Sequence, residues 1–205
     1  MDSPIAALRP QDFYRLASGS VLPRPIAWIS TCDARGGANL APFSFFTVAS
    51  IAPPVLAFSH VNRRDLRDKD TLVNLLHGGG CVVHTVAQAM AEAMNLSSAE
   101  IPPDCDEFAL AGLAMIDSHC VAAPSLRDAA VRFECRLRDI VRFGEQPMAG
   151  QLVLLDVVHV SVDETMLDER GHVDSARLDL VGKLGDDSYC TTHERFTLAR
   201  PTSPR

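Results

Sequence analysis

The chain has 205 residues, of which 47% are hydrophobic and 22% are charged. These values are typical of one folded domain with a buried core, so we expect a single domain over residues 1–205. The formal net charge of −7 argues against a nucleic-acid-binding protein, because such proteins neutralise phosphates with an excess of Lys and Arg.

Export, membrane insertion and metal binding find no support in the sequence. No stretch approaches the roughly 20 consecutive apolar residues of a membrane-spanning helix, and residues 1–10 lack the pattern of a signal peptide. The six cysteines show no CxxC spacing and no pairing with histidine at metal-ligand spacing. We therefore expect a cytoplasmic protein with reduced cysteines, no membrane contact and no metal site.

The first third of the chain predicts strands joined by short turns. Residues 26–31 are apolar, residues 33–37 supply turn-forming Asp and Gly, and residues 39–50 continue with Phe, Val and Thr. Two such runs around a glycine-containing loop predict a hairpin. Residues 56–61 predict a further strand.

Two short helices are predicted in the middle of the chain. Asp70 can cap a helix that starts at Thr71, and the glycines 78–80 suit its left-handed end. Residues 81–86 predict a strand, and residues 87–95 have the strongest helix propensity in the chain. Residues 97–106 predict a polar loop, because two prolines exclude a helix there.

The second half contains the clearest alternation, over residues 131–138. It predicts a strand whose core face carries Val131, Phe133, Cys135 and Leu137 and whose exposed face carries Arg132, Glu134, Arg136 and Arg138. After a turn at 144–150, residues 151–162 predict a long strand, with His159 on its exposed face. Several strands and only short helices favour a mainly β protein with a closed antiparallel barrel over a βαβ fold.

A cationic cluster precedes the first predicted helix. Four basic residues stand within seven positions of this acidic chain: Arg63, Arg64, Arg67 and Lys69. Together with the Thr71 hydroxyl and the free N–H groups of a helix start, they would bind a dianion. The alternative is a solvated loop in which the arginines pair with Asp65, Asp68 and Asp70.

The segment 42–47 is the second candidate ligand-binding feature. Strand alternation places Phe43 and Phe45 opposite Ser44 and Phe46, so that one face offers a hydroxyl and the other a flat apolar surface. A planar aromatic ligand with a polar tail would suit such an edge, and core packing explains the phenylalanines equally well. No histidine pairs with another at helical spacing, and we assign none of them acid–base catalysis.

Several short motifs follow one another along the chain. They are residues 23–31 (PRPIAWIST), 39–46 (NLAPFSFF), Pro53-Pro54, Lys69-Asp70-Thr71 with Asn74, Met94-Asn95, 106–108 (DEF) with 111–113 (AGL), and Leu184-Gly185 with Tyr189 and 196–201 (FTLARP). In their order and spacing, over about residues 10–201, they resemble the flavin reductase-like family of FMN-binding split barrels, especially its flavoredoxin-like members.

The resemblance implies a six-stranded Greek-key split β-barrel with short peripheral helices, and a homodimer with one FMN per subunit near the interface. Arg63, Lys69 and Thr71 would hold the FMN phosphate, with Asn74 as structural support. Asn95 would reach a flavin, in its own subunit or across the interface, Tyr189 would cover the site, and Arg24 is a candidate donor near N1 and O2 of the ring. The segment that would line the flavin ring, partly through its backbone, is Asn39, Pro42, Phe43, Ser44, Phe45 and Phe46.

The activity implied by the resemblance is that of an FMN-binding oxidoreductase. It would take hydride from NAD(P)H onto flavin N5 and pass the electrons to a flavin or to a partner monooxygenase or redox protein. We assign no catalytic side chain, because the cofactor performs the chemistry.

Two departures from the family pattern leave alternatives open. The turn at residues 144–148 (GEQPM) lacks the Gly-Asp-His motif that many of these flavin reductases carry, which puts NAD(P)H use in doubt. Lys183 stands where the family usually has Arg, so the positive charge is kept and the bidentate hydrogen-bond donor of a guanidinium is lost. The alternatives are a flavoredoxin-like electron carrier with tightly bound FMN and no direct NAD(P)H use, and a split-barrel protein that holds another ligand such as haem.

Overall fold

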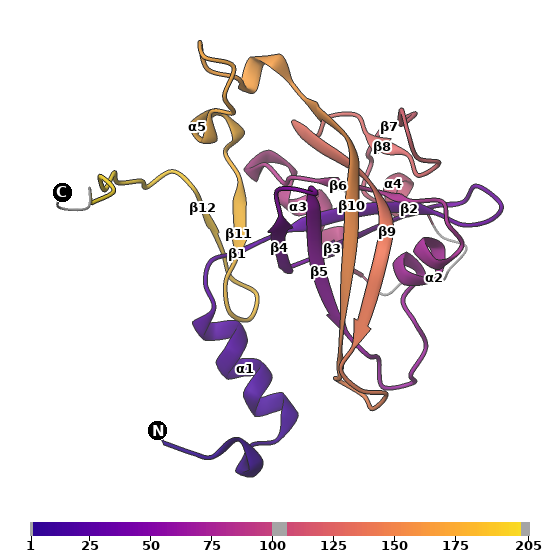
Figure 1. Cartoon of the computed structure of the whole chain (residues 1–205), viewed down its shortest axis with the longest axis vertical. Coiled ribbons are helices and arrows are strands. Elements are labelled where there is room, and N and C mark those ends of the chain that lie inside the picture. The colour runs from indigo at the N-terminus through magenta and orange to yellow at the C-terminus, as the bar shows by residue number, and fades with distance from the viewer. Residues whose placement is uncertain (1, 100–105, 202–205) are drawn as a thin grey trace.

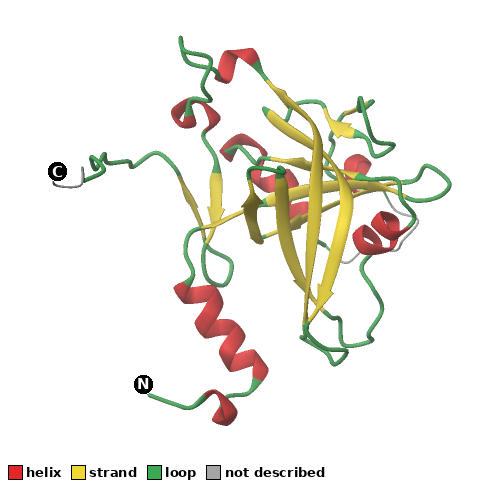
Figure 2. Ribbon diagram, viewed as in Figure 1, coloured by secondary structure: helices red, strands yellow, loops and turns green. Residues whose placement is uncertain are grey.

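The computed structural model describes residues 2–99 and 106–201. In this part of the chain the main element is an antiparallel sheet of seven strands in the order β3-β2-β6-β9-β10-β5-β4, which curls as Figures 1 and 2 show. Its strands are β2 (Ala27–Cys32), β3 (Ala38–Phe43), β4 (Phe45–Ser50), β5 (Val55–Val61), β6 (Cys81–His84), β9 (Val131–Arg142) and β10 (Gly150–Val162).

Smaller elements surround this sheet. A second sheet joins β1 (Arg24–Pro25), β11 (Val181–Lys183) and β12 (Tyr189–Thr191), and a short ladder joins β7 (Met115–Ile116) and β8 (Ser125–Leu126). The described helices are all short: η1 (Ile5–Ala7), α1 (Pro10–Ser20), α2 (Asp70–Leu76), η2 (Gln88–Met90), α3 (Ala91–Leu96), α4 (Glu107–Leu110), η3 (Glu164–Met166) and α5 (Ser175–Leu178). None of them is long and apolar enough to cross a bilayer. The prediction of a mainly β protein with short peripheral helices is confirmed.

The first predicted hairpin is confirmed. β2 and β3 pair in antiparallel register from Ala27 opposite Phe43 to Cys32 opposite Ala38. The Asp33 carboxylate accepts hydrogen bonds from the backbone N–H groups of Arg35 and Gly37, at 2.8 and 2.7 Å, and so holds the turn.

Ser44 interrupts the segment that the sequence predicts as one strand over residues 39–50. β3 ends at Phe43 and β4 begins at Phe45, and the two lie at opposite edges of the main sheet. The main sheet of the described residues therefore has seven strands instead of the expected six. Because no ladder joins β3 to β4 in this part of the chain, the barrel is open, and the prediction of a closed barrel was wrong.

The hairpin of β9 and β10 lies between β6 and β5, a non-sequential order of the Greek-key kind. The core face predicted for β9 is confirmed, because Val131 and Cys135 are buried and Phe133 and Leu137 pack against the core. The exposed face is wrong at Glu134, which is only 2% exposed. Residues 117–126 cover it, as the hydrogen bonds from His119 and Cys120 to its carboxylate show.

The helix predicted after the cationic cluster begins one residue earlier than expected. Lys69 occupies the N-cap position without a side-chain capping hydrogen bond, and Asp70 lies in the first turn instead of capping the helix as predicted. The glycine stop is confirmed, because Gly78 follows with φ = 89°. Residues 88–96 form η2 and α3, close to the prediction, whereas part of the predicted loop at 97–106, including both prolines, lies outside the described residues.

The core lies on both faces of β2. Ala27 and Ile29 pack inside the barrel with Phe58 and Val153. Trp28 faces outward into a second cluster under α3, α4 and β8, built with Met94, Phe108 and Leu126 among others. Every residue of β2 is therefore buried, and its hairpin with β3 gives the surrounding loops a rigid base.

His84 is a fully buried titratable group in this second layer. Its Nδ1 donates to the carbonyl oxygen of Trp28 at 2.8 Å, and its Nε2 accepts from the backbone N–H of Leu126 at 2.9 Å. This arrangement requires the neutral ring, and burial lowers the pKa of His84 to about 4.

We predict that His84 makes the fold less stable in acid. In the unfolded chain the pKa of His84 returns to 6.5, so below that pH the unfolded state binds a proton that the folded state does not. The contribution of His84 to the free energy of unfolding is complete above pH 6.5 and falls by about 3 kcal/mol as the pH drops to 4. Urea unfolding of wild type, His84→Gln and the exposed control His77→Gln across this range measures it. An equally steep pH dependence in His84→Gln would contradict the assignment.

Candidate functional site

Two adjoining cavities lie beside β3 and the start of α2. The first has a volume of about 230 Å³ and the second about 280 Å³. Pro42 and Ser98 line both, so the cavities meet at these residues. The first is lined by Asn39, Ala41, Arg63, Asp68, Lys69, Asp70, Thr71, Ser97, Ala99 and Glu107 as well, and the second by Ile26, Ser44, Met94, Asn95, Lys183, Asp186, Asp187 and Tyr189.

A buried polar network supports the first cavity. The side-chain amide of Asn39, on β3, donates to the hydroxyls of Thr31 at 3.3 Å and Thr71 at 3.2 Å. Asn74 of α2 donates to the same Thr31 hydroxyl at 3.0 Å. Because the Thr71 hydroxyl accepts from Asn39, its own proton remains for another acceptor.

The cationic cluster divides between two roles. Arg63 and Lys69 line the first cavity together with Thr71, and the Lys69 Nζ lies 5.2 Å from the centroid of the Phe43 ring. Arg67 instead pairs with Asp65 at 2.8 Å, and Arg63 Nε lies 3.5 Å from the same carboxylate. The ion-pair explanation therefore holds for Arg67, whereas dianion binding by Arg63 and Lys69 stays a prediction.

Three carboxylates also line the first cavity. Asp68 accepts from Gln151 Nε2 at 3.2 Å, and Glu107 accepts from the backbone N–H of Leu40 at 3.1 Å. Burial raises the pKa of Glu107, and the nearby Asp70 adds to this effect. Two of the three carboxylates thus accept hydrogen bonds from neutral donors.

The second cavity brings together residues from distant parts of the chain. Tyr189 Oη donates to Asn95 Oδ1 at 3.2 Å, and Lys183 Nζ lies 4.1 Å from the centroid of the Tyr189 ring. Lys183 and Tyr189 are opposite each other in the β11–β12 ladder. Burial lowers the pKa of Lys183 and raises that of Tyr189.

The three phenylalanines of segment 42–46 line neither cavity among the described residues. Phe43 packs in the core against Phe58, with ring centroids 4.7 Å apart, and Phe46 packs against the same core. Phe45 lies 6.3 Å from the ring of Tyr14 on α1. Phe43 and Phe46 thus face the core together, contrary to the predicted alternation, because the strand breaks at Ser44.

Arg24 has a structural role that the sequence did not indicate. It is 6% exposed, and its guanidinium donates to the backbone carbonyls of Ser18, Val21 and Leu184, the last at 2.8 Å. It ties the end of α1 and the segment after β11 to β1. These contacts direct part of the guanidinium toward the protein's own backbone, and Nε lies 3.5 Å from Ser44 Oγ on the wall of the second cavity.

Seven of the ten candidate residues meet at these cavities. Sequence reasoning did not select Ser98 or Glu107, because a serine or a glutamate in a polar segment gives no signal of its own. Lys183 stood out only as a departure from the family pattern. The seven residues are Asn39, Pro42, Ser44, Arg63, Lys69, Thr71 and Asn95.

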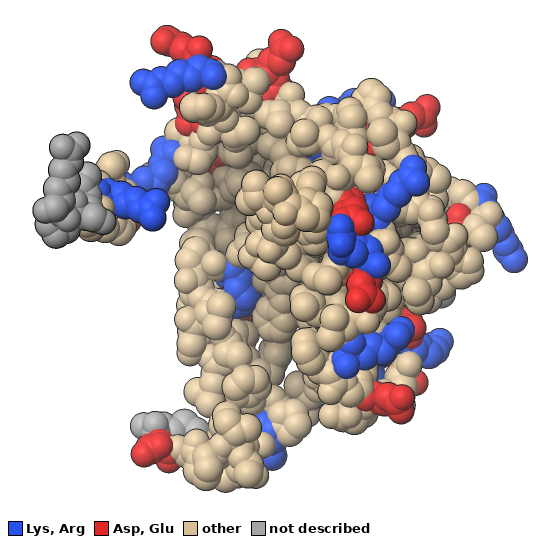
Figure 3. All heavy atoms as spheres, in the orientation of Figure 1, with Lys and Arg blue, Asp and Glu red and all other residues tan. Residues whose placement is uncertain are grey.

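Neither basic nor acidic side chains dominate the face of the molecule that Figure 3 shows. Figure 3 shows basic and acidic side chains interspersed on this face. Among the described residues, the cationic side chains that line the two cavities are Arg63 and Lys69 in the first and Lys183 in the second.

Comparison with known proteins points to one family. Residues 18–177 match the family model described as flavin reductase like domain. The chain is 37% identical over 198 residues to the uncharacterised protein YwrF of Bacillus subtilis (strain 168), covering 95% of this chain and 96% of that protein.

Two solved structures share the fold over nearly their whole length. Nitrilotriacetate monooxygenase component B from Bacillus cereus gives a TM-score of 0.90 at 30% identity, covering 97% of this chain and 98% of that one. The 2-nitrobenzoate 2-nitroreductase NbaA of Pseudomonas fluorescens gives a TM-score of 0.88 at 28% identity, covering 100% and 98%.

Proposed function

Because the chain belongs to the family of flavin reductase like domains, we propose that it is an FMN-binding oxidoreductase that takes hydride from NAD(P)H and passes electrons to a flavin or a partner protein. The observation that carries this proposal is the pair of adjoining cavities, with Arg63, Lys69 and Thr71 at one end and Pro42 between them. FMN has the matching form, a planar ring joined by a sugar chain to a dianionic phosphate.

The donor set of the first cavity fits a phosphate. Two cations and a hydroxyl are groups that bind phosphate oxygens with charge-assisted hydrogen bonds. Asn39 holds the Thr71 hydroxyl in place, and the α2 segment carries Lys69 and Thr71 two residues apart. Asn39 thus acts as a positioning residue for this end of the ligand.

The second cavity suits the ring end of the ligand. Pro42 and Ser44 form part of its wall, and the hydrogen bond between Tyr189 and Asn95 joins two other parts of that wall. Bound FMN would supply the hydride acceptor at this place, while the side chains orient it and exclude water. We assign no catalytic side chain.

A partner monooxygenase is part of the proposal. The Bacillus cereus structure, which is 30% identical and matches over nearly the whole chain, is described as component B of nitrilotriacetate monooxygenase. A component is, by that description, one part of a monooxygenase that has at least one further part. We propose a comparable role here, with the partner's substrate left open.

The second candidate function is that of an electron carrier with bound FMN. The observation that favours it is the turn at residues 144–148, which holds no histidine. This turn lies beside the segment that precedes Arg63, because the Asn62 side chain donates to the carbonyl oxygens of Gly144 at 3.2 Å and Gln146 at 3.1 Å. A family motif for nicotinamide handling is thus absent at a place that adjoins the proposed site.

We predict that Arg63→Ala combined with Lys69→Ala weakens FMN binding by about 3 kcal/mol or more, roughly a hundredfold in Kd, because hydrogen bonds to charged groups contribute most of the phosphate affinity. Fluorescence titration with FMN measures the change. Arg64→Ala combined with Arg67→Ala is the matched control, since it removes the same charge from side chains that do not line the cavity. Equal losses in both double variants would show that the effect is general electrostatics.

Rapid mixing of the FMN-loaded protein with NADH and with NADPH separates the two functions. We expect loss of flavin absorbance with at least one donor if the protein is a reductase. Bound FMN that neither donor reduces would favour the carrier. Purified protein that is colourless and does not bind FMN in titration would favour a different ligand, such as haem.

We also propose that the protein forms a homodimer through its two outlying segments. Figure 1 shows α1 and the chain after β12 lying away from the main sheet. They expose large apolar side chains, with Phe13 52%, Phe196 85% and Leu198 80% exposed. Apolar side chains on extended segments gain stability when a second copy covers them.

Size-exclusion chromatography with light scattering tests this association. We expect a dimer for wild type and a shift toward monomer for Phe196→Ser combined with Leu198→Ser. Leu110→Ser on α4, also an exposed leucine, is the control and leaves the dimer intact. A wild-type monomer at all concentrations would rule out the dimer.

A further inference from the structure

A row of paired residues crosses the outer face of the main sheet. Ser30 is opposite Val82, Val82 is opposite Glu134, and Glu134 is opposite His159. These positions alternate with core residues such as Cys135, so their side chains point away from the barrel interior.

Residues 117–126 are fastened over this row by hydrogen bonds. Ser30 Oγ donates to the carbonyl oxygen of Pro124. The Glu134 carboxylate accepts from the backbone N–H groups of His119, at 2.8 Å, and Cys120. The segment therefore has a fixed place on the sheet, and His119 is carried to the edge of the row.

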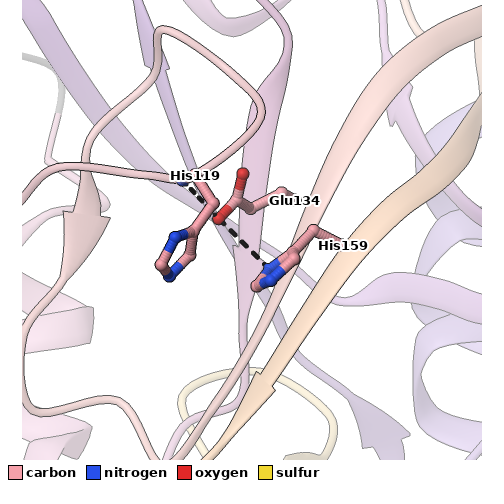
Figure 4. Close-up of side chains that lie close together, drawn as sticks. All are labelled: His119, Glu134 and His159. Atoms are coloured by element: carbon pink, nitrogen blue, oxygen red, sulfur yellow. Dashed lines mark hydrogen bonds and ion pairs between the residues drawn. The ribbon is translucent and has the colours of Figure 1, made fainter.

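This fastening brings two imidazoles and a carboxylate together. The rings of His119 and His159 lie with centroids 4.5 Å apart, and Glu134 Oε1 lies 3.4 Å from His159 Nδ1. One ligand atom from each of the three residues lies within 4.8 Å of the other two. Figure 4 shows the carboxylate between the two histidines, which come from a loop and from β10.

The cluster offers a position for a cation. Glu134 is 2% exposed and accepts two backbone hydrogen bonds, and an opposite charge beside a buried carboxylate stabilises it further. His159 Nδ1 is buried and has no hydrogen-bond partner in the described structure, although it faces that carboxylate. Two lone-pair-bearing atoms 3.4 Å apart are stable only with a proton or a metal ion between them.

We propose that His119, Glu134 and His159 bind one divalent transition-metal ion of the Zn²⁺ type. Two imidazole nitrogens and one carboxylate oxygen are a ligand set that suits Zn²⁺ and its neighbours. Tetrahedral bonds of about 2.0 Å place ligand atoms about 3.3 Å apart, close to the Glu134–His159 distance. His119 is exposed, so its ring is able to rotate and bring a ring nitrogen within bonding distance of the ion. A proton shared by Glu134 and His159 would not require a second imidazole beside them.

The site is separate from the proposed flavin site. None of the three residues lines either of the two cavities described above. The ion would join the loop to β9 and β10, so it would stabilise this part of the fold independently of FMN. The carboxylate keeps a lone pair on each oxygen for this purpose, since each accepts one backbone hydrogen bond.

Calorimetric titration of tag-free, chelator-treated protein with Zn²⁺ tests the proposal, with Co²⁺ absorption as a second readout. We expect one Zn²⁺ per chain and, with Co²⁺, the intense visible bands of a four-coordinate ion. His119→Ala and His159→Ala should each weaken binding about tenfold or more. The control His172→Ala, a histidine beside Asp168 outside the cluster, should bind as wild type does.

Two results would overturn the proposal. Absence of saturable binding to wild type at micromolar Zn²⁺ would leave a proton-bridged pair of Glu134 and His159. Unchanged binding in His119→Ala would place the ion elsewhere. Because His119 is exposed, this variant is expected to fold even where His159→Ala does not, and circular dichroism checks both.

Discussion

The amide of Asn39 joins the two elements on which the proposed site depends. It is buried on β3 and donates to Thr31 on β2 and to Thr71 on α2. Buried polar groups keep such partners, because leaving one unpaired is costly. These hydrogen bonds therefore fix the position of Thr71 relative to β3. They also fix the start of α2, which carries Lys69 at its N-cap. The first cavity is therefore built on the hairpin of β2 and β3.

The parts of the site that the sequence predicts are those with a local signal. The hairpin of β2 and β3 has its turn residues at 33–37, and α2 has its glycine stop after His77. Four basic residues in an acidic chain are visible before any fold is known. Local geometry then decides which of them enter the cavity, and the pairing of Arg67 with Asp65 removes one of them.

The parts that the sequence does not predict depend on contacts between distant segments. Alternation places Glu134 on an exposed face, and only the covering loop at residues 117–126 makes it buried. One irregular residue, Ser44, changes which phenylalanines face the core. The resemblance places Asn95 and Tyr189 near the same ligand, but their direct hydrogen bond joins residues far apart in the chain and has no signal in the sequence.

A crystal structure of the protein grown with FMN tests the central claim most directly. We expect the phosphate to contact Arg63 and Lys69 in the first cavity and the ring to occupy the second, with Pro42 between them. A flavin bound elsewhere on the chain, with the two cations turned only toward neighbouring carboxylates, would contradict the account.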